Sequence, residues 1–333
     1  MSILGREKIV GFTDEEFKEK VNKANKELVN DFLKQSHLSE KTLKQYKSAL
    51  YIFCKWVHEE CGEDEKIPEL RPRHALRFQN FMIDSGLSSS GIKFKRSAVS
   101  SLFNFIEVYW SDEYPSCRNI YTKAIPSVEN IKKKEKVPLT PDEITRLIDV
   151  LTERKDWQKI AYLRLTYITG CRREESRQFL KEIINHEKVK DKDGKQKKYY
   201  VTNKVRAKGR GREGKERRFK FNDEAMDAIK KWVEYRGTQV TNDDCPYLFV
   251  SKTKDGYKQV HPNTFNLWCE DFTEILDGKL VFPHLLRSSR ATNAVLEDGV
   301  DVKAVQDMLG HKSSETTEIY IVREEEDLDD DLY

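Results

Sequence analysis

Apolar residues recur at helical spacing through the first third of the chain. Between Leu43 and Val57 they fall every three or four positions, and similar stripes run through residues 72–84 and 92–110. A stripe of this period buries one face of a helix against a core. Serines at 39 and 88 precede two of the stripes as capping signals. The pattern therefore predicts a helical bundle in this part of the chain.

One more amphipathic stretch precedes the bundle. Thr13 and Glu16 have the spacing of a capping box, which opens a helix that we expect to continue through about Gln35. Its apolar stripe, which includes Phe17 and Phe32, must pack on something. The pattern leaves open whether that partner is this chain or a neighbouring molecule.

A basic segment bracketed by Pro126 and Pro138 separates the bundle from the rest of the chain. Its charge and its prolines are typical of an exposed linker. Thr140 and Glu143 form a second capping box, with a proline at the first helical position. Apolar stripes over residues 144–151 and 160–169 predict the first two helices of a second domain.

Between residues 197 and 250 the pattern becomes partly strand-like. Lys197–Thr202 and Arg218–Phe221 have strand composition and flank a Gly-rich turn at residues 208–217. Helices are predicted after Asn222 and after Pro262, with a short strand at Tyr247–Val250 between them. The expected fold class is mainly α, with a small antiparallel β-sheet in the second domain.

Composition narrows the class of protein. A chain of 333 residues with 38% hydrophobic and 11% aromatic residues is long enough for two domains with sizeable cores. No apolar run reaches the ~18 residues of a membrane span, and residues 1–8 lack the apolar core of a signal peptide. Six cysteines without a Cys-x-x-Cys pair suggest neither disulfides nor zinc. We expect a cytoplasmic protein with reduced thiols and no metal.

The charge is unevenly distributed. The net charge is +3, but residues 324–333 hold seven acidic and no basic side chains, so residues 1–323 carry +10. Residues 187–220 contain fifteen Lys or Arg against five Asp or Glu. Such an excess suits contact with nucleic-acid phosphates, although a solvated loop is the ordinary alternative. Residues 209–215 match Gly-x-x-x-x-Gly-Lys, but Glu216 follows where a nucleotide-binding loop has Ser or Thr, so ATP binding is not expected.

The C-terminal region carries most of the candidate chemistry. His284 and Arg287 lie three residues apart in a predicted helix that ends near Gly299, so both can reach one anionic target. A second helix is predicted at about residues 302–309, where Gly310 offers a left-handed stop before His311. Tyr320 follows nine residues later.

These motifs together resemble the catalytic region of the tyrosine recombinase (phage integrase) family. The family pattern is His-x-x-Arg, a helix, Leu-Gly-His, and a nucleophilic tyrosine nine residues on, with Thr-Gly-x-Arg-x-x-Glu upstream. Thr169–Glu175 matches this upstream motif. The offset from both the glycine and the glutamate selects Arg172 as the family's arginine over its neighbour Arg173.

The resemblance implies a role for each of these side chains. Arg172 and Arg287 would bind the non-bridging oxygens of a DNA phosphate, with Glu175 orienting rather than reacting. His284 and His311 would hold the phosphate and help to deprotonate Tyr320, which would attack and keep the 3′ phosphate. No metal or nucleotide cofactor is implied.

A lysine on the family's β-hairpin would protonate the departing 5′ hydroxyl. Lys208 is the preferred candidate because it follows a predicted strand, and Lys215 is the alternative. The family usually compresses the two lysines into Lys-Gly-x-Lys-x-Arg, whereas here they are seven residues apart, so the sequence does not separate them. Neighbouring cations would depress the pKa of such a lysine.

The resemblance also implies a two-domain clamp on double-stranded DNA. We expect an N-terminal helical extension at 1–36, a helical core-binding domain at 37–125, a linker at 126–138, and a catalytic domain with an acidic tail at 139–333. The tail would either dock on a neighbouring protomer or be disordered. Candidate DNA contacts are Lys93, Lys95, Arg96, Lys132, Lys133, Arg210, Arg212 and Arg290.

The expected partners are DNA core sites arranged as inverted repeats and three further copies of this chain. The family's strand exchange implies a homotetramer on two duplexes, a monomer or dimer when free, and room for an accessory DNA-bending protein. Two alternatives stay open at this stage. One is strand relaxation of the type IB topoisomerase kind, and the other is a non-catalytic DNA-binding protein that keeps the fold.

Overall fold

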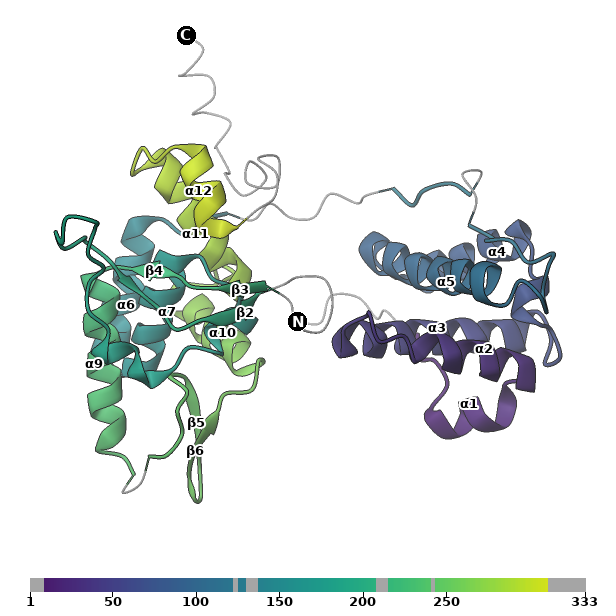
Figure 1. Cartoon of the computed structure of the whole chain (residues 1–333), viewed down its shortest axis with the longest axis horizontal. Coiled ribbons are helices and arrows are strands. Elements are labelled where there is room, and N and C mark those ends of the chain that lie inside the picture. Colours follow the sequence, from purple (N-terminus) through teal and green to yellow (C-terminus); the bar gives the residue numbers. More distant parts are fainter. Residues whose placement is uncertain (1–8, 122–124, 130–136, 208–214, 241–242, 311–333) are drawn as a thin grey trace, which may run out of the picture. The chain divides into compact units, whose positions relative to one another are not determined.

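The described part of the chain forms two compact units. The computed structural model describes residues 9–121, 125–129, 137–207, 215–240 and 243–310 (Figure 1). The described residues up to 129 belong to the first unit, and those from 137 onward belong to the second. Among these residues, no helix combines the length and the apolar character that crossing a membrane requires.

The regular elements described in the first unit are all helices. Four of its helices each contribute a fully buried residue to one core: Leu28, Phe53, Phe78 and Phe103. The predicted helical bundle is therefore confirmed. The helices are α1 (Asp14–Lys20), α2 (Lys23–Leu33), α3 (Glu40–Glu60), the 3-10 turn η1 (Ile67–Glu69), α4 (Pro72–Asp84) and α5 (Ser89–Tyr109).

The N-terminal stretch forms two helices, so the prediction of a single helix to Gln35 is wrong. Helix α1 ends at Lys20, where Val21 takes an extended conformation, and Asn22 then caps α2 by accepting a hydrogen bond from the backbone N–H of Asn25 at 2.9 Å. The Asn22 amide also donates to the carbonyls of Glu63 and Glu65 at 3.2 and 3.1 Å. These distant partners stabilise the break.

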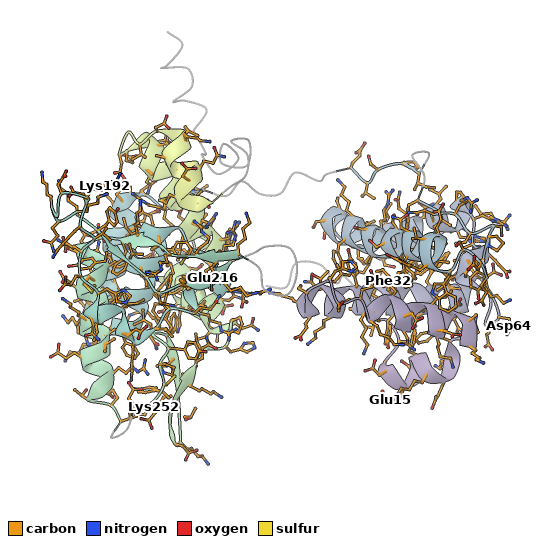
Figure 2. All side chains as sticks on the ribbon, viewed as in Figure 1. Glu15, Phe32, Asp64, Lys192, Glu216 and Lys252 are labelled. Atoms are coloured by element: carbon orange, nitrogen blue, oxygen red, sulfur yellow. The ribbon has the colours of Figure 1, made fainter. Side chains whose placement is uncertain are left out.

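Both N-terminal helices pack within this chain, which settles the question that the pattern left open. The ring of Phe17 stacks on Tyr51 of α3, with ring centroids 4.2 Å apart. Phe32, labelled in Figure 2, contacts Tyr46 of α3 and Phe105 of α5. The apolar stripe of residues 17–33 is thus part of the core of the first unit.

The second unit combines helices with short antiparallel strand pairs, which confirms the predicted fold class. Its helices are α6 (Pro141–Glu153), α7 (Trp157–Thr169), α8 (Arg173–Ser176), α9 (Asp223–Gly237), α10 (Thr264–Ile275), α11 (Pro283–Leu296) and α12 (Val302–Leu309), with a 3-10 turn η2 (Lys181–Asn185). Its strands are β1 (Tyr200–Val201), β2 (Val205–Ala207), β3 (Lys215–Arg217), β4 (Lys220–Phe221), β5 (Val250–Thr253) and β6 (Gly256–Gln259).

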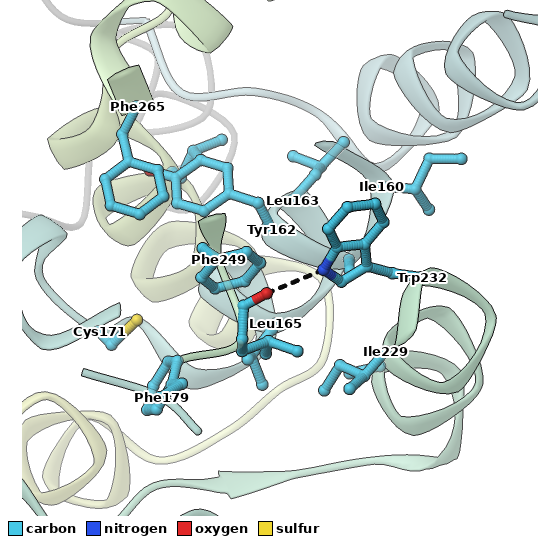
Figure 3. Packing of buried hydrophobic residues seen from close by; sticks show 14 of the residues in the cluster. Ile160, Tyr162, Leu163, Leu165, Cys171, Phe179, Ile229, Trp232, Phe249 and Phe265 are labelled. Atoms are coloured by element: carbon cyan, nitrogen blue, oxygen red, sulfur yellow. Dashed lines mark hydrogen bonds between the residues drawn. The ribbon is translucent and has the colours of Figure 1, made fainter. Parts of the chain in front are cut away.

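Helix α7 lies at the centre of this unit, in contact with α6, α9 and α11. Tyr162 stacks on Phe265 of α10 with ring centroids 4.5 Å apart, and Leu163 and Leu165 are fully buried (Figure 3). A helix that is apolar on nearly all sides has to be enclosed by others. The indole N–H of Trp232 donates to the carbonyl of Leu248 at 2.9 Å, so this buried polar group has a hydrogen-bond partner within the core.

The strands are shorter than the sequence predicts and lie partly elsewhere. β1 pairs with β4, with Tyr200 opposite Phe221, and β2 pairs with β3, with Ala207 opposite Lys215. Lys215–Arg217, which the sequence assigns to the Gly-rich turn, is therefore a strand. The predicted strand at Tyr247–Val250 begins only at its last residue and pairs as β5 with β6. Backbone pairing decides these positions, which composition alone does not reveal.

Helix α11 is fixed by the segment that opens the second unit. The hydroxyl of Ser289 accepts a hydrogen bond from the backbone N–H of Leu139 at 2.8 Å, and the amide of Asn293 donates to the carbonyl of Leu139 at 2.9 Å. Both α11 side chains are buried. This contact holds the helix that carries His284 and Arg287.

Candidate active site

A tight turn at the end of α7 is the structural centre of the site. Gly170 ends the helix in the left-handed conformation, with φ +56. A Cβ at this position would lie 2.7 Å from Cδ2 of Leu309, so glycine is required both for the turn and for the approach of α12. The turn delivers Arg172 to the start of α8.

Arg172 and Glu175 form a compact pair across the first turn of α8. The buried carboxylate of Glu175 accepts a hydrogen bond from the backbone N–H of Arg172 at 2.6 Å and another from Nη1 of its guanidinium at 3.2 Å. The Arg172 side chain is 31% exposed, whereas that of Glu175 is 2% exposed. The carboxylate therefore orients an arginine that still reaches solvent.

Arg287 lies inside the protein and reaches the same turn from α11. It is 1% exposed, and its guanidinium donates to the carbonyl of Gly170 through Nη1 and to the carbonyl of Leu309 through Nη2, the latter at 2.8 Å. Two carbonyls from separate segments fix the plane of the group. Arg172 and Arg287, 115 residues apart in sequence, thus converge on the Gly170–Arg172 segment.

His284 lies one helical turn before Arg287, in the first turn of α11 after Pro283. Its side chain is exposed, in contrast to the buried Arg287. The spacing of three residues places both on the same helix face, as the sequence predicts.

The end of α12 is held by a second arginine, which the sequence analysis did not single out. Arg217 of β3 donates from Nη1 to the carbonyl of Leu309 and from Nη2 to the carbonyl of Met308, both at 2.8 Å. Gly310 ends the helix with φ +67, which confirms the predicted left-handed stop. A Cβ on Gly310 would lie 2.7 Å from Nη1 of Arg217, so the guanidinium packs directly against this glycine.

Arg217 belongs electrostatically to the same cluster. Burial lowers the pKa of its guanidinium, the carboxylate of Glu175 acts in the opposite direction, and the positive charge of Arg172 lowers the pKa further. Burial raises the pKa of the neighbouring Cys171 thiol to about 12, so this cysteine is an unreactive neutral group at physiological pH. Three arginines around one buried carboxylate give the site an excess of positive charge suited to an anion.

Several predicted site residues lie outside the described part of the chain. They are Lys132, Lys133, Lys208, Arg210, Arg212, His311 and Tyr320. Their neighbours in sequence are described: β2 ends at Ala207, directly before Lys208, and α12 ends at Leu309, two residues before His311. Lys215, the alternative to Lys208, is exposed at the start of β3.

The remaining candidate DNA contacts have varied surroundings. Lys93 is exposed, and burial lowers the pKa of Lys95. Arg96 donates to the carbonyl of Pro126 at 2.8 Å and lies over the ring of Tyr121. Arg290 forms an ion pair with Asp298 at 2.7 Å. Arg96 and Arg290 would have to exchange internal contacts for phosphate oxygens on binding DNA.

Exposed lysines gather on the loop between η2 and β1. The exposed members are Lys190, Lys192, Lys195, Lys197 and Lys198, and Figure 2 labels Lys192. Their charge is only partly offset by Asp191 and Asp193. This loop supplies part of the basic excess seen in the sequence, and its exposure suits contact with a polyanion.

Comparison with known protein families matches both units. Residues 138–326 match the model described as "Phage integrase family", and residues 25–107 match that of "Phage integrase, N-terminal SAM-like domain". The first match covers more than half of the chain.

Similar proteins extend over nearly the whole chain. The SPbeta prophage-derived recombinase-like protein YomM of Bacillus subtilis (strain 168) is 30% identical over 304 residues, which are 90% of this chain and 87% of the relative. A tyrosine recombinase of Thermosipho africanus (strain TCF52B) is 26% identical over 89% of this chain and 93% of its own length.

Solved structures share the fold. The Tn1549 transposon integrase in complex with transposon right end DNA aligns with a TM-score of 0.64 at 16% identity, covering 90% of this chain and 95% of the integrase. The XerH site-specific recombinase bound to palindromic difH substrate aligns with a TM-score of 0.65 at 19% identity, covering 96% of this chain and 86% of XerH.

Proposed function

The chain belongs to the phage integrase family of tyrosine recombinases, and we propose that it is a site-specific DNA recombinase that acts through a covalent 3′-phosphotyrosine at Tyr320. The observation that carries the proposal is the convergence of Arg172 and Arg287 on one turn, with Leu309 held beside it. Segments that are distant in sequence meet there, as a single phosphate site requires.

Phosphate binding is the task of the two arginines. A phosphodiester repels nucleophiles, and its transition state concentrates negative charge on the non-bridging oxygens. Guanidinium groups stay charged at any physiological pH and offer several donors in one plane. Glu175 holds Arg172 in place, and the carbonyls of Gly170 and Leu309 hold Arg287, so neither group has to be ordered during the reaction.

Proton transfer and bond exchange fall to the other motif residues. Tyr320 attacks phosphorus and the 5′ oxygen leaves, taking a proton from Lys208, or from Lys215 if that lysine is the general acid. His284 and His311 donate hydrogen bonds to the phosphate and assist in removing the tyrosine proton. A 5′ hydroxyl of another strand then reverses the step, which restores the tyrosine and joins the new strands.

We propose a core-binding domain at 37–125, a linker at 126–138 and a catalytic domain at 139–333. The extension at 1–36 would act together with the core-binding domain, because α1 and α2 pack into the same core. Lys93, Lys95 and Arg96 would contact the DNA backbone from the first domain, Lys132 and Lys133 from the linker, and Arg210, Arg212 and Arg290 from the second. These contacts would be sensitive to salt.

The proposed substrate is double-stranded DNA with inverted-repeat core sites. The structures of XerH bound to palindromic difH substrate and of the Tn1549 integrase bound to transposon end DNA support this substrate class. Exchange between two duplexes calls for four active protomers, so we propose a homotetramer on DNA that is a monomer or dimer when free. The need for an accessory DNA-bending protein would depend on the DNA site. The protein would act in the cytoplasm.

The topoisomerase-like and non-catalytic alternatives are not favoured. Relatives that match about 90% of the chain are named as recombinases. A recombinase joins strands from two duplexes, a type IB enzyme relaxes supercoils within one, and a binding protein does neither.

The test begins with DNA duplexes selected for binding from a randomised pool. Nicked versions trap the covalent intermediate, because the short strand next to the cleaved bond diffuses away. We expect a DNA adduct that resists denaturation, is lost in Tyr320→Phe and is kept in the matched control Tyr333→Phe. Product joining between two differently labelled duplexes establishes recombination. Tight binding without an adduct would contradict the proposal.

A further inference from the structure

Arg217 links two elements that both serve the proposed reaction. It stands on β3, whose partner β2 ends directly before Lys208, and its guanidinium caps the end of α12, which leads directly to His311. Its two partners, Met308 and Leu309, lie 91 and 92 residues after it in the sequence. In the family pattern Lys-Gly-x-Lys-x-Arg quoted above, Lys215–Arg217 has the spacing of the final Lys-x-Arg, but the sequence alone assigned this arginine no role.

The contact between Arg217 and the end of α12 has well-defined hydrogen-bond geometry. Both terminal nitrogens of Arg217 donate, one to each of the last two carbonyls of α12, and Nη1 would lie 2.7 Å from a Cβ on Gly310. The last carbonyls of a helix lack intrahelical partners, and a cation there also complements the helix dipole. The side chain further lies over the ring of Phe219, 4.7 Å from its centroid.

The carbonyl of Leu309 accepts hydrogen bonds from two arginines at once. Arg217 reaches it from the hairpin and Arg287 from α11, each at 2.8 Å. Movement of Leu309 would therefore disturb both guanidiniums. The proposed phosphate ligand Arg287 and the turn before His311 share one anchor, and Arg217 is the part of that anchor supplied by the hairpin.

We propose that Arg217 is a positioning residue for strand cleavage: it fixes the Leu309–Gly310 turn so that His311 and Arg287 keep their places at the scissile phosphate. This inference rests on the proposed function. The role assigned to Arg217 is to hold the end of α12, where its two terminal nitrogens donate to carbonyls of the protein, and it includes no contact with the phosphate. Its loss acts on the rate of cleavage and leaves DNA affinity nearly unchanged.

The variants are Arg217→Gln and Arg217→Lys, with Arg218→Gln as the charge-matched control. Arg218 is the exposed neighbour, so its substitution removes the same charge from the same segment. A displacement of about 1 Å in a catalytic group can cost about 10²-fold in rate, and we expect a loss of this order for Arg217→Gln. Arg217→Lys retains one donor and should be intermediate. Arg218→Gln should cleave as the unmodified protein does.

The measurements are the single-turnover rate of adduct formation and the affinity for the selected nicked duplex, with melting temperatures to establish folding. If Arg217→Gln does not fold, Arg217→Lys carries the test. A purely structural role would be independent of His311, so the losses in the double variant Arg217→Gln/His311→Ala would multiply. Positioning through the turn instead predicts that the double variant loses clearly less than the product of the two single losses, because the part of the Arg217→Gln effect that passes through His311 is already gone in His311→Ala.

A duplex with sulfur at the 5′ bridging position separates the two elements that Arg217 links. A thiolate leaves without a proton, so this substrate removes the need for the hairpin lysine. Our proposal predicts that the deficit of Arg217→Gln persists on it. Full rescue would show that Arg217 acts through the lysine and would overturn the proposal, as would a normal rate on ordinary DNA. Absence of any adduct with the unmodified protein would instead refute the proposed function.

Discussion

Replacing Arg287 by lysine separates the structural role of this residue from its proposed chemical role. Lysine keeps the charge and most of the stem, but its single ammonium cannot reproduce the planar fork of a guanidinium. In the structure that fork joins the carbonyl of Gly170 to that of Leu309 while the side chain is 1% exposed. Arg287→Lys can keep one of these contacts and must lose the other.

The two effects differ in size. A hydrogen bond from a charged donor contributes about 1.5–3 kcal/mol, so we expect the free energy of unfolding to fall by about 2 kcal/mol. Domains of this kind are stable by about 5–15 kcal/mol, so the variant remains folded. Loss of a planar donor to the transition state costs on the order of 10² to 10³ in rate, which corresponds to about 3–4 kcal/mol of barrier. The loss in rate therefore exceeds what unfolding explains.

The assay pairs urea denaturation with single-turnover adduct formation on the selected nicked duplex. Leu151→Ala is a suitable control for stability, because Leu151 is fully buried in α6 of the same unit and such truncations cost about 2–5 kcal/mol. We expect the control to be destabilised at least as much as Arg287→Lys and to cleave at a nearly normal rate. A normal cleavage rate for folded Arg287→Lys would refute its assignment as a phosphate ligand.

Three further predictions concern Glu175 and Gly170 of the site and His74 of the first unit. Glu175→Gln should slow cleavage about tenfold or more with little change in DNA affinity, since an amide N–H then faces the Arg172 guanidinium; an unchanged rate would contradict the orienting role. Gly170→Ala should lower the free energy of unfolding by more than the ~1–2 kcal/mol of a left-handed alanine, because its Cβ meets Leu309 at 2.7 Å. Gly194 has φ +78 and open space around it, so Gly194→Ala should lower the free energy of unfolding only by the cost of the left-handed backbone. Equal destabilisation by Gly170→Ala and Gly194→Ala would show that the contact of Cβ with Leu309 does not matter. Burial lowers the pKa of His74 from 6.5, so the unfolded chain binds a proton there more readily than the folded one, and the free energy of unfolding should fall as the pH drops below about 6.5. His74→Asn should lose less of this free energy between pH 7 and 5 than the unmodified protein, and parallel plots of stability against pH for the two proteins would argue against this.

Local signals in the sequence located most of the helices. Thr13 and Thr140 each form the reciprocal capping box that their spacing predicts, and Gly310 ends α12 where expected. These features depend on residues within one turn of each other. The pairing of Arg172 with Glu175 is of the same kind, so the sequence could anticipate it.

The errors arose where distant partners decide the structure. The apolar stripe continues in phase through Asn22, and the hydrogen bonds from Asn22 to the distant carbonyls of Glu63 and Glu65 add to its local cap on Asn25 in stopping the helix there. Lys215–Arg217 is fully charged and lacks any strand pattern, yet it pairs with β2. Arg217 was overlooked for the same reason, because its partners on α12 lie more than 90 residues further on.

The most direct test of the central claim is to identify the residue that carries DNA. Nicked duplex is incubated with the unmodified protein, the adduct is digested with protease and nuclease, and the linked peptide is sequenced by mass spectrometry. The chain contains 14 tyrosines, so the position is informative. We predict a nucleotide 3′ phosphate on the peptide that contains Tyr320. Linkage at another residue, or cleavage without any covalent peptide, would contradict the account.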